Sequence, residues 1–314
     1  MNILIGYTGF VGSNLYRQHI FDSAFNSKNI SDAYASNPDL CVYAGVRAEK
    51  FLANSDPKSD MVIIENAIEN IKHINPKRLV LISTIDVFKS PCNCDENTSI
   101  QENDLHTYGY NRYQLEKWCI ENIANCHILR LPGLFGKNIK KNFIYDLIHI
   151  LPSVLNESRF NEFSAKEAII NCSYIKQDNG FYKLKTITKN ERADLIEAFA
   201  RLNFSALNFT DSRAIFQFYN LIYLWSHIEF VIKNDVQLLH LAVEPVSACE
   251  LYSFINGENF INEIDNNPPH YDFKSIYADR LSGDDGYIFN KQQVLTEIKK
   301  FIINYVLYKD IYTI

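Results

Sequence analysis

The 314-residue chain is predicted to be an α/β protein, with a Rossmann-type doubly wound parallel sheet and a smaller, mixed C-terminal lobe. Three observations predict this fold class. The apolar run Ile3–Ile5 leads directly into a turn with three glycines and then into a helix-like segment that ends near Gln18. Strand-like and helix-like segments then alternate as far as Leu131, which is typical of a parallel sheet covered by helices. The second half lacks this alternation.

Five segments are expected to form strands, because each is short, apolar and bounded by polar or turn residues. They are Ile3–Ile5, Ser23–Phe25, Asp39–Gly45, Arg78–Ser83 and His127–Leu131. Only roughly a dozen residues separate the second segment from the third, whereas a crossover helix plus another strand needs about 30. We therefore expect the third strand of the usual fold to be missing and that edge of the sheet to be trimmed.

The helices are predicted from apolar residues that recur with helical spacing. In the first half they are a short segment at Ser31–Ser36, Asp60–Ile74, and a helix from Tyr108 to about Ala124. In the second half we expect helices at Asn142–Leu151, Glu191–Leu202, Phe216–Ile232, Leu251–Ile255 and Gln292–Tyr305, strands at Tyr182–Ile187 and Leu238–Val243, and an edge segment at Ala206–Asp211. Ser247 and Glu250 form a capping box before Leu251.

The glycines at 6, 9 and 12 fit a turn that holds a phosphate. The first permits a tight turn, the second lets backbone approach a pyrophosphate, and the third lets the helix pack on the strand. The N-terminus of the following helix then offers free N–H groups to the anion. Glycines also serve ordinary turns, but this triplet stands between a strand and a helix. The sequence therefore predicts a dinucleotide-binding site.

Composition excludes several classes of protein. The net charge of -6 argues against nucleic acid or an anionic membrane as the main partner. There is no apolar run of 18 residues, and the apolar start breaks at Gly6 without a basic region, so neither a membrane span nor a signal peptide is expected. Seven scattered cysteines favour the reducing cytoplasm. The histidines have no metal-ligand spacing, so no metal site is expected.

Three residues could carry redox chemistry beside a nicotinamide. Thr84 lies just past the end of a central strand, at the edge of the sheet where ligands bind, and Tyr108 begins a helix with Arg112 one turn further on. The phenol can exchange a proton with a carbonyl or alcohol, the cation lowers the phenol pKa, and the hydroxyl holds the substrate oxygen. Most Tyr-x-x-x-Arg pairs in proteins are only surface packing, so the spacing alone leaves this role open.

The motifs resemble those of the extended short-chain dehydrogenases/reductases, the NAD-dependent epimerase/dehydratase family that modifies nucleotide sugars. The resemblance rests on Gly6-x-x-Gly9-x-x-Gly12, on Ser83–Phe88, which is most similar to the motif of deoxysugar 4-ketoreductases, and on Tyr108-Gly109-x-Asn111-Arg112-x-x-x-Glu116. It is close over residues 1–145 and loose beyond them. We accordingly divide the chain into a dinucleotide-binding domain, 1–140, and a substrate-binding lobe, 141–314, from which some segments return to the first domain.

The resemblance assigns residues to three roles. Catalysis falls to Thr84, Tyr108 and Arg112. The cofactor is expected to contact Gly6, Thr8, Gly9, Phe10, Val11, Gly12, Asn26, Ser27, Lys28, Ala44, Gly45, Asn66, Ser83, Leu131 and Pro132. The nucleotide sugar is expected to contact Asp86, Asn142, Arg213 and Gln217.

Two departures from the family pattern stand out. Arg112 replaces the catalytic lysine, and a guanidinium is not equivalent to an ammonium. A second register, Tyr113-x-x-x-Lys117, would restore the lysine, but Gly109 and Glu116 fit only the first register.

No acidic residue ends the second strand; Asn26, Ser27 and Lys28 stand there, and their donors suit a 2′-phosphate. Both NADP and NAD stay open, with NADP favoured, since Lys28 could also be an ordinary solvated lysine.

The resemblance implies an NAD(P)-dependent oxidoreductase or epimerase of nucleotide-linked sugars, most of all a 4-keto-sugar reductase in envelope or capsule polysaccharide biosynthesis. It also implies a cytoplasmic homodimer packed through two helices per subunit. The alternative is a catalytically impaired protein that binds a dinucleotide or sugar nucleotide in a regulatory or scaffold role. Arg112 and the trimmed sheet edge motivate that alternative.

Overall fold

The computed structural model describes residues 1–311, with side chains throughout except at 51, 52 and 308–311. The chain forms two compact units. Unit 1 consists of Met1–Ile139, Ile215–Val246 and Pro269–Phe301; unit 2 consists of Lys140–Ala214, Ser247–Pro268 and the chain from Ile302 on. Two parts of unit 2 are therefore insertions between segments of unit 1.

Unit 1 is built on a six-stranded sheet in the order β12-β5-β4-β3-β1-β2, and all five strand pairs are parallel. The strands are β1 (Asn2–Ile5), β2 (Ser23–Phe25), β3 (Leu40–Tyr43), β4 (Leu79–Thr84), β5 (Cys126–Leu131) and β12 (Leu238–His240). From β2 the chain passes through a 3₁₀ turn, Ile30–Ala33, directly to β3 on the other side of β1. The expectation of a missing third strand is confirmed, because β2 is the edge strand.

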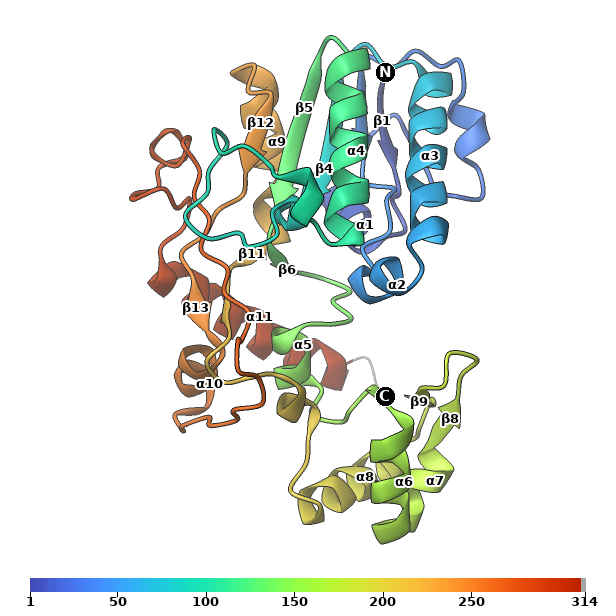
Figure 1. Ribbon diagram of the computed structural model, residues 1–314, viewed down its shortest axis with the longest axis vertical. Helices are drawn as coiled ribbons and strands as arrows, with labels where there is room; N and C mark the ends of the chain where they lie inside the picture. Colours follow the sequence, from blue (N-terminus) through green and yellow to red (C-terminus); the bar gives the residue numbers. More distant parts are fainter. Residues whose placement is uncertain (312–314) are drawn as a thin grey trace. The chain divides into compact units, whose positions relative to one another are not determined.

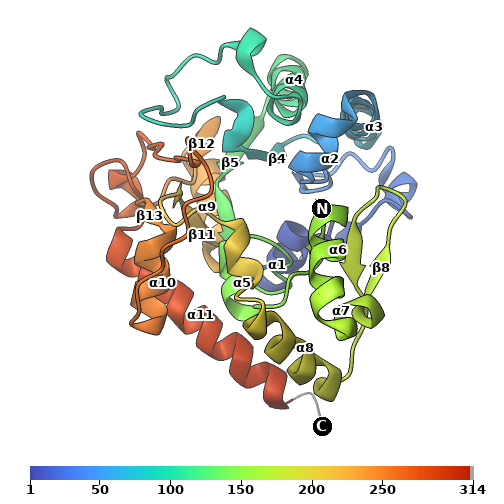
Figure 2. The same ribbon diagram turned by 60° about the horizontal axis from the view of Figure 1, so that its bottom comes forward.

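Helices cover both faces of this sheet. Figure 1 shows α3 (Pro57–Ile74) and α4 (Thr107–Asn122) side by side, and Figure 2 shows them on the opposite side of the strands from α1 (Phe10–Gln18) and α9 (Leu224–Lys233). Alternate strand residues point to opposite faces. Accordingly the buried cluster under α3 and α4 takes every second strand residue: Ile3, Ile5, Cys41, Tyr43, Leu79 and Leu81.

Helix α3 shows how local sequence sets an element. Pro57 occupies its first turn, where a missing N–H is harmless, and the Asp56 side chain accepts a hydrogen bond from the Ser59 amide. Asn75 ends it in the left-handed conformation. The helix therefore begins three residues before the Asp60 expected from apolar spacing alone. A short helix that was not expected, α2 (Lys50–Ser55), precedes it.

The expected helix Phe216–Ile232 is wrong in its first half. Unit 1 has β10 (Ile215–Phe216) and β11 (Phe218–Asn220) there, and β11 pairs with β6 (Gly133–Phe135). Asn220 then caps a 3₁₀ turn, Leu221–Tyr223, that leads into α9. Aromatic residues suit strands as well as helices, and pairing with β6 decides the outcome. β13 (Val246–Ser247) and α11 (Lys291–Ile311) complete the elements that begin in unit 1.

Unit 2 combines short helices with a small antiparallel sheet, β7-β9-β8. Its elements are α5 (Phe143–Ile148), β7 (Val154–Leu155), α6 (Glu157–Lys166), α7 (Ala168–Ser173), β8 (Tyr174–Lys176), β9 (Tyr182–Leu184), α8 (Lys189–Arg201) and α10 (Ala248–Asn256). The capping box of Ser247 and Glu250 is confirmed. The expected edge segment at Ala206–Asp211 is wrong, because Ser205 caps a 3₁₀ turn over Ala206–Phe209.

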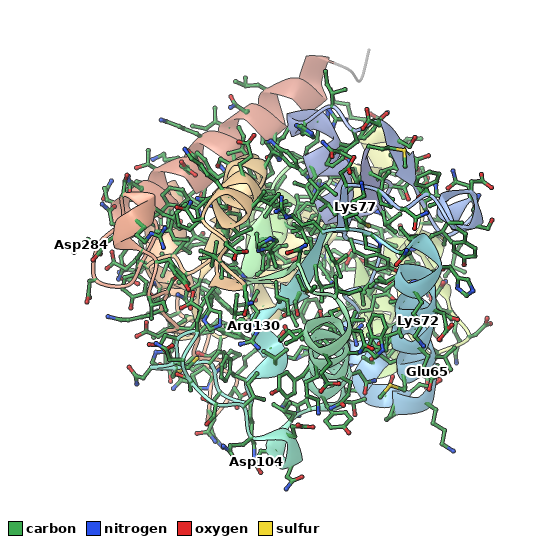
Figure 3. The ribbon with its side chains drawn as sticks, turned by 90° about the horizontal axis from the view of Figure 1, so that it is seen from above. Glu65, Lys72, Lys77, Asp104, Arg130 and Asp284 are labelled. Atoms are coloured by element: carbon green, nitrogen blue, oxygen red, sulfur yellow. The ribbon has the colours of Figure 1, made fainter. Side chains whose placement is uncertain are left out.

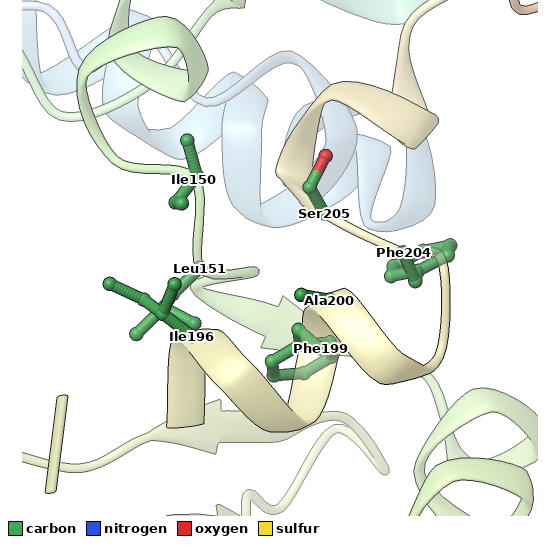
Figure 4. A pocket seen from close by; sticks show the side chains of 7 residues that line it. All are labelled: Ile150, Leu151, Ile196, Phe199, Ala200, Phe204 and Ser205. Carbon is green, nitrogen blue, oxygen red and sulfur yellow. The ribbon is translucent and has the colours of Figure 1, made fainter. Parts of the chain in front are cut away.

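The core of unit 2 is aromatic and encloses a small pocket. Phe160, Phe163, Tyr174 and Phe199 are buried in it with aliphatic neighbours. The pocket has a volume of about 130 Å³ and is lined by Ile150, Leu151, Ile196, Phe199, Ala200, Phe204 and Ser205 (Figure 4). Among the described residues, no helix is both long and apolar enough to cross a membrane.

Candidate active site

The turn after β1 requires glycine for two physical reasons. Gly6 has a φ of +88°, and its amide donates to the Phe25 carbonyl at 2.7 Å. A Cβ at Gly6 would lie 2.5 Å from the Ala44 carbonyl oxygen, and one at Gly12 would lie 2.1 Å from that of Gly6. Helix α1 can therefore pack against the end of β1 only with a glycine at position 12, as the spacing predicts.

The first turn of α1 is open to an anion. Gly9 is its N-cap, no side chain of the described residues caps it, and Thr8 and Gly9 are exposed. The amides of the first helical residues, Phe10, Val11 and Gly12, are not used by the helix's own ladder. Amides and a positive helix end suit a diphosphate, so these residues fit the phosphates of a dinucleotide.

The turn after β2 lies next to the glycine turn, because the Gly6 amide bonds to the last residue of β2. Asn26 Oδ1 accepts from the Lys28 backbone N–H at 2.9 Å, and the Asn26 backbone N–H donates to Asn29 Oδ1 at 2.8 Å. Ser27 and Lys28 are exposed on this turn. Their donors are accessible beside the glycine turn, where a ribose or its 2′-phosphate would lie.

Thr84 and Tyr108 lie together at the carboxyl edge of the same sheet. Thr84 is the last residue of β4, and its Oγ1 accepts from the Asp86 amide at 3.2 Å. A Cβ on Gly109 would lie 2.0 Å from the Asp86 carbonyl oxygen, so the start of α4 rests directly on the 3₁₀ turn Ile85–Val87. This contact places Tyr108, which is 6% exposed, close enough to Thr84 that the threonine hydroxyl lowers the pKa of the phenol.

Several groups act on the pKa of Tyr108. Burial has the largest effect and raises the pKa; Arg112, the Thr84 hydroxyl and Lys50 lower it, and the charge of Asp86 raises it. The net pKa lies above the usual value. The phenol is therefore protonated at neutral pH and can donate.

Arg112 stacks on Tyr108 but is held by other groups. Its guanidinium carbon lies 4.0 Å from the centre of the Tyr108 ring. One terminal nitrogen forms a buried ion pair with Asp60 on α3, and the other donates to the Arg47 carbonyl at 2.6 Å. Asn111 also donates to Asp60, at 2.8 Å. Arg112 supplies the expected charge beside the phenol, while its contact with a cofactor ribose stays a prediction.

The residues of the alternative register, Tyr113 and Lys117, make contacts outside the Thr84–Tyr108 site. Lys117 pairs with Glu102, with contacts of 2.7 and 2.8 Å, and Tyr113 packs beside the cluster that contains Ile85 and Phe88. Tyr108 contacts Thr84, so the geometry favours the first register.

A second charged cluster adjoins this pair and was not found from the sequence. Lys50 Nζ donates to Asp86 Oδ1 at 2.8 Å, and Tyr271 Oη donates to the same oxygen at 2.9 Å. The Lys50 and Tyr271 polar atoms are 3.3 Å apart. The place of Asp86 in the Thr84 motif was the only signal, since Tyr271 lies 185 residues further along the chain.

A buried polar network fixes α4 to the sheet. Glu116 forms an ion pair with Arg130 of β5 and accepts from the Ser83 hydroxyl. Arg130 also donates to His240 Nε2 at 3.2 Å, while His240 Nδ1 contacts the Lys274 carbonyl. Figure 3 shows Arg130 in the interior, whereas Asp104 and Asp284 lie at the periphery. Burial and the charge of Arg130 lower the pKa of His240 to about 3, so its ring is neutral.

The remaining residues predicted to bind cofactor or substrate lie at strand ends, on α3 and in the interior. Ala44 and Gly45 follow β3, Leu131 and Pro132 end β5, and Asn66 is exposed on α3. The Gln217 amide is buried and occupied by the backbone of Val243 and Phe273, which gives it a structural role.

Asn142 and Arg213 belong to unit 2. Asn142 caps α5, and Arg213 forms a bidentate pair with buried Asp211, at 2.8 and 3.0 Å. Hydrogen bonds from Arg213 hold the pKa of Asp211 well below its usual range. Substrate contacts by these two residues stay predictions.

Within the described part of the chain, no group of three or more acidic, histidine or cysteine side chains could hold a metal ion. All seven cysteines are free.

The sheet order and the glycine turn define a fold class: the fold of the short-chain dehydrogenases/reductases. No protein-family model matches the sequence, and no curated protein matches it either.

Solved structures confirm the fold. The dTDP-4-dehydrorhamnose reductase from Bacillus anthracis, in complex with NADP, aligns with a TM-score of 0.62 at 15% identity, over 97% of this chain and 99% of that one. A short-chain dehydrogenase/reductase superfamily protein from Agrobacterium tumefaciens with bound NAD gives 0.59 at 12% identity, over 99% of both chains. UDP-glucose 4-epimerase from Thermotoga maritima, with UDP-glucose, gives 0.56 at 11% identity, over 89% and 92%. At these identities the likeness is one of fold.

Proposed function

We propose that this protein is an NAD(P)-dependent oxidoreductase of nucleotide-linked sugars, specifically a 4-keto-sugar reductase. One observation carries the proposal: Thr84 and Tyr108 meet at the sheet edge that also carries the open glycine turn. Gly6 follows β1 and Thr84 ends β4, two strands away, so the two residues lie on the order of 10 Å apart at that edge. The reductases and epimerases that share the fold act on nucleotide sugars according to their names, which supports the same substrate class.

The residues suggest a division of labour. A reduced nicotinamide dinucleotide supplies the hydride when it is bound. Tyr108 Oη donates the proton to the ketone oxygen, which leaves an alcohol. Thr84 Oγ1 accepts from the Asp86 amide, so its own hydrogen can be donated to Tyr108 or to the ketone oxygen. Arg112 supports the tyrosinate that forms when the proton leaves, because its charge lies over the ring.

The glycine turn and the Asn26–Lys28 turn would hold the cofactor, with NADP favoured because Ser27 and Lys28 offer exposed donors and no carboxylate stands at the end of β2. Arg213 and Asn142 of unit 2 would bind the nucleotide sugar. Arg213 suits its diphosphate, because Asp211 holds the guanidinium in place while the side chain is still 46% exposed.

The test is an assay of the purified protein with NADPH and NADH against a panel of nucleotide-linked 4-keto sugars. We expect Tyr108→Phe to lower kcat by about 100-fold or more while dinucleotide binding is kept. Tyr110→Phe is the matched control, because Tyr110 lies exposed on the same helix, and we expect wild-type rates from it. Wild-type turnover no faster than buffer with every substrate would refute the proposal.

One observation favours the alternative of an impaired binding protein: Arg112 replaces the family's lysine and is tied to Asp60. Arg112→Lys, assayed beside the wild type, separates the two functions. Activity that appears only in this variant would support the binding role and exclude the reductase.

We also propose that the protein is a cytoplasmic homodimer. The two helices in contact would be α3 and α4, which lie side by side and expose Val62 and Ile120. The free cysteines agree with a reducing compartment. Sedimentation of the purified protein measures its oligomeric state.

A further inference from the structure

Asp86 places a carboxylate beside the phenol that the proposed mechanism uses. A negative charge there opposes loss of the Tyr108 proton, and Asp86 does raise the pKa of Tyr108. Arg112 cannot fully offset it, because Asp60 neutralises Arg112 in a buried ion pair. The site therefore needs another cation close to Asp86.

We propose that Lys50 is a positioning residue of this site, which neutralises Asp86 beside Tyr108 and fixes the carboxylate for a substrate hydroxyl. This inference rests on the proposed function. The proposal gives Lys50, on α2, the role of the ammonium that is missing at position 112, where an arginine stands.

The geometry of Asp86 supports this role. Lys50 Nζ and Tyr271 Oη both bind Oδ1, at 2.8 and 2.9 Å, and among the described residues no donor reaches Oδ2. The carboxylate is thus held from one side, while its second oxygen keeps its lone pairs for a hydroxyl donor. Asp86 is also the residue whose amide binds Thr84 and whose carbonyl touches Gly109. A movement of Asp86 would therefore move both Thr84 and the start of α4.

Lys50 differs from an ordinary surface lysine. Isolated surface ion pairs contribute little, but this pair has a third partner in Tyr271, and the Asp86 side chain is only 20% exposed. Burial lowers the pKa of Lys50, but the charge of Asp86 and the hydrogen bonds to Asp86 and Tyr271 outweigh this effect, so the net pKa is raised and the ammonium stays charged. Burial raises the pKa of Tyr271 to about 12, so Tyr271 is protonated and donates.

The experiment titrates Tyr108 directly. The tyrosinate absorption of a Tyr108→Phe variant is subtracted from that of its parent across a range of pH, in four backgrounds: wild type, Lys50→Met, Lys50→Arg, and Lys50→Met with Asp86→Asn. The charged and titratable groups that act on Tyr108 are Arg112 on its own helix, Asp86 after β4, and Lys50 on α2. All except Lys50 and Asp86 stay unchanged in this series.

We expect Lys50→Met to raise the Tyr108 midpoint by about 0.5 to 1 pH unit, a three- to tenfold change in the proton equilibrium. Lys50→Arg should keep the wild-type midpoint. Adding Asp86→Asn to Lys50→Met should bring the midpoint back to its wild-type value. Lys117→Met is the matched control, because Lys117 forms an ion pair of similar length with a different carboxylate, Glu102. It should leave the midpoint unchanged.

An unchanged midpoint in folded Lys50→Met, or a shift that the second substitution does not reverse, would overturn the inference. The readout does not depend on turnover. Failure of the proposed reductase activity can therefore be distinguished from failure of the Lys50 assignment. If the protein is active, Lys50→Met should also raise KM more than it lowers kcat, while Lys50→Arg restores KM.

Discussion

Gly109 controls how closely helix α4 approaches the end of β4. Its missing side chain leaves room for the Asp86 carbonyl, and this contact places Tyr108 beside Thr84. The Tyr-Gly pair of the motif is thus explained by packing rather than by backbone flexibility, since Gly109 lies inside a regular helix.

We expect Gly109→Ala to destabilise the fold by about 1–3 kcal/mol, because the added methyl must displace backbone. It should also lower activity, since Tyr108 moves with the helix. Gly180→Ala is a useful comparison: no atom lies within 4 Å of its Cβ position and the cost, about 1 kcal/mol, comes only from its positive φ. Urea unfolding and kcat measure both effects; full activity in Gly109→Ala would contradict the placement.

At this scale the sequence predicted local motifs better than distant partners. Gly6, Gly12, Thr84 and Tyr108 lie where their spacing placed them, because strand, turn and helix follow one another within a few residues. Tyr271 could not be predicted as a neighbour of Asp86, because no short-range pattern connects residues so far apart in the chain. The Asp60 partner of Arg112 was missed for the same reason.

Helix α4 is held in register by Glu116 as well as by apolar packing. The helix has buried polar residues on the face toward the sheet, and Glu116 meets Arg130, Ser83 and, through Arg130, His240. A buried pair of this kind contributes specificity of placement more than net stability. Thr84 follows Ser83 directly, so the same network supports both ends of the proposed catalytic pair.

Glu116→Gln should destabilise the protein by about 3 kcal/mol or more, because it leaves Arg130 charged and buried without its partner. The double variant Glu116→Leu, Arg130→Met should recover much of that loss, since no unpaired charge remains. Chemical unfolding of the two variants gives the comparison. A double variant as unstable as the single one would show that Arg130 is not the reason for the loss.

The elements were predicted well where apolar periodicity is strong and poorly where pairing decides. Helix α3 has one clear buried face, and the central strands of the main sheet are short apolar runs that are buried on both faces. β10 and β11 were expected as helix because aromatic residues fit either structure, and only pairing of β10 with β13 and of β11 with β6 selects the strand. In unit 2, helices α6 and α7 were not expected at all.

The stability of the whole molecule should fall in acid because of its buried histidines. Burial lowers the pKa of His240 to about 3 and that of His227 to about 4, below the ordinary value of 6.5. Between these values the unfolded chain binds protons that the folded chain does not, so unfolding is favoured as the pH falls from about 6.5 towards 3. The loss should amount to a few kcal/mol.

His240→Gln should make the unfolding free energy depend less on pH between about 4 and 6.5 than in the wild type. His106→Gln is the control, because His106 is exposed at the start of α4. Urea unfolding at several pH values gives both slopes, and equal slopes in wild type and His240→Gln would contradict the assignment.

The order of the segments along the chain determines where residues can be added or removed during evolution. The last strand of the sheet, β12, enters only after the first insertion of unit 2 has ended, and Pro269–Phe301 returns after the second. A fragment that stops at residue 140 would lack the strand that borders β5. Conversely, either insertion can gain or lose residues between fixed anchor points without disturbing strand order. Changes in the inserts can therefore alter unit 2 while the glycine turn after β1 is kept.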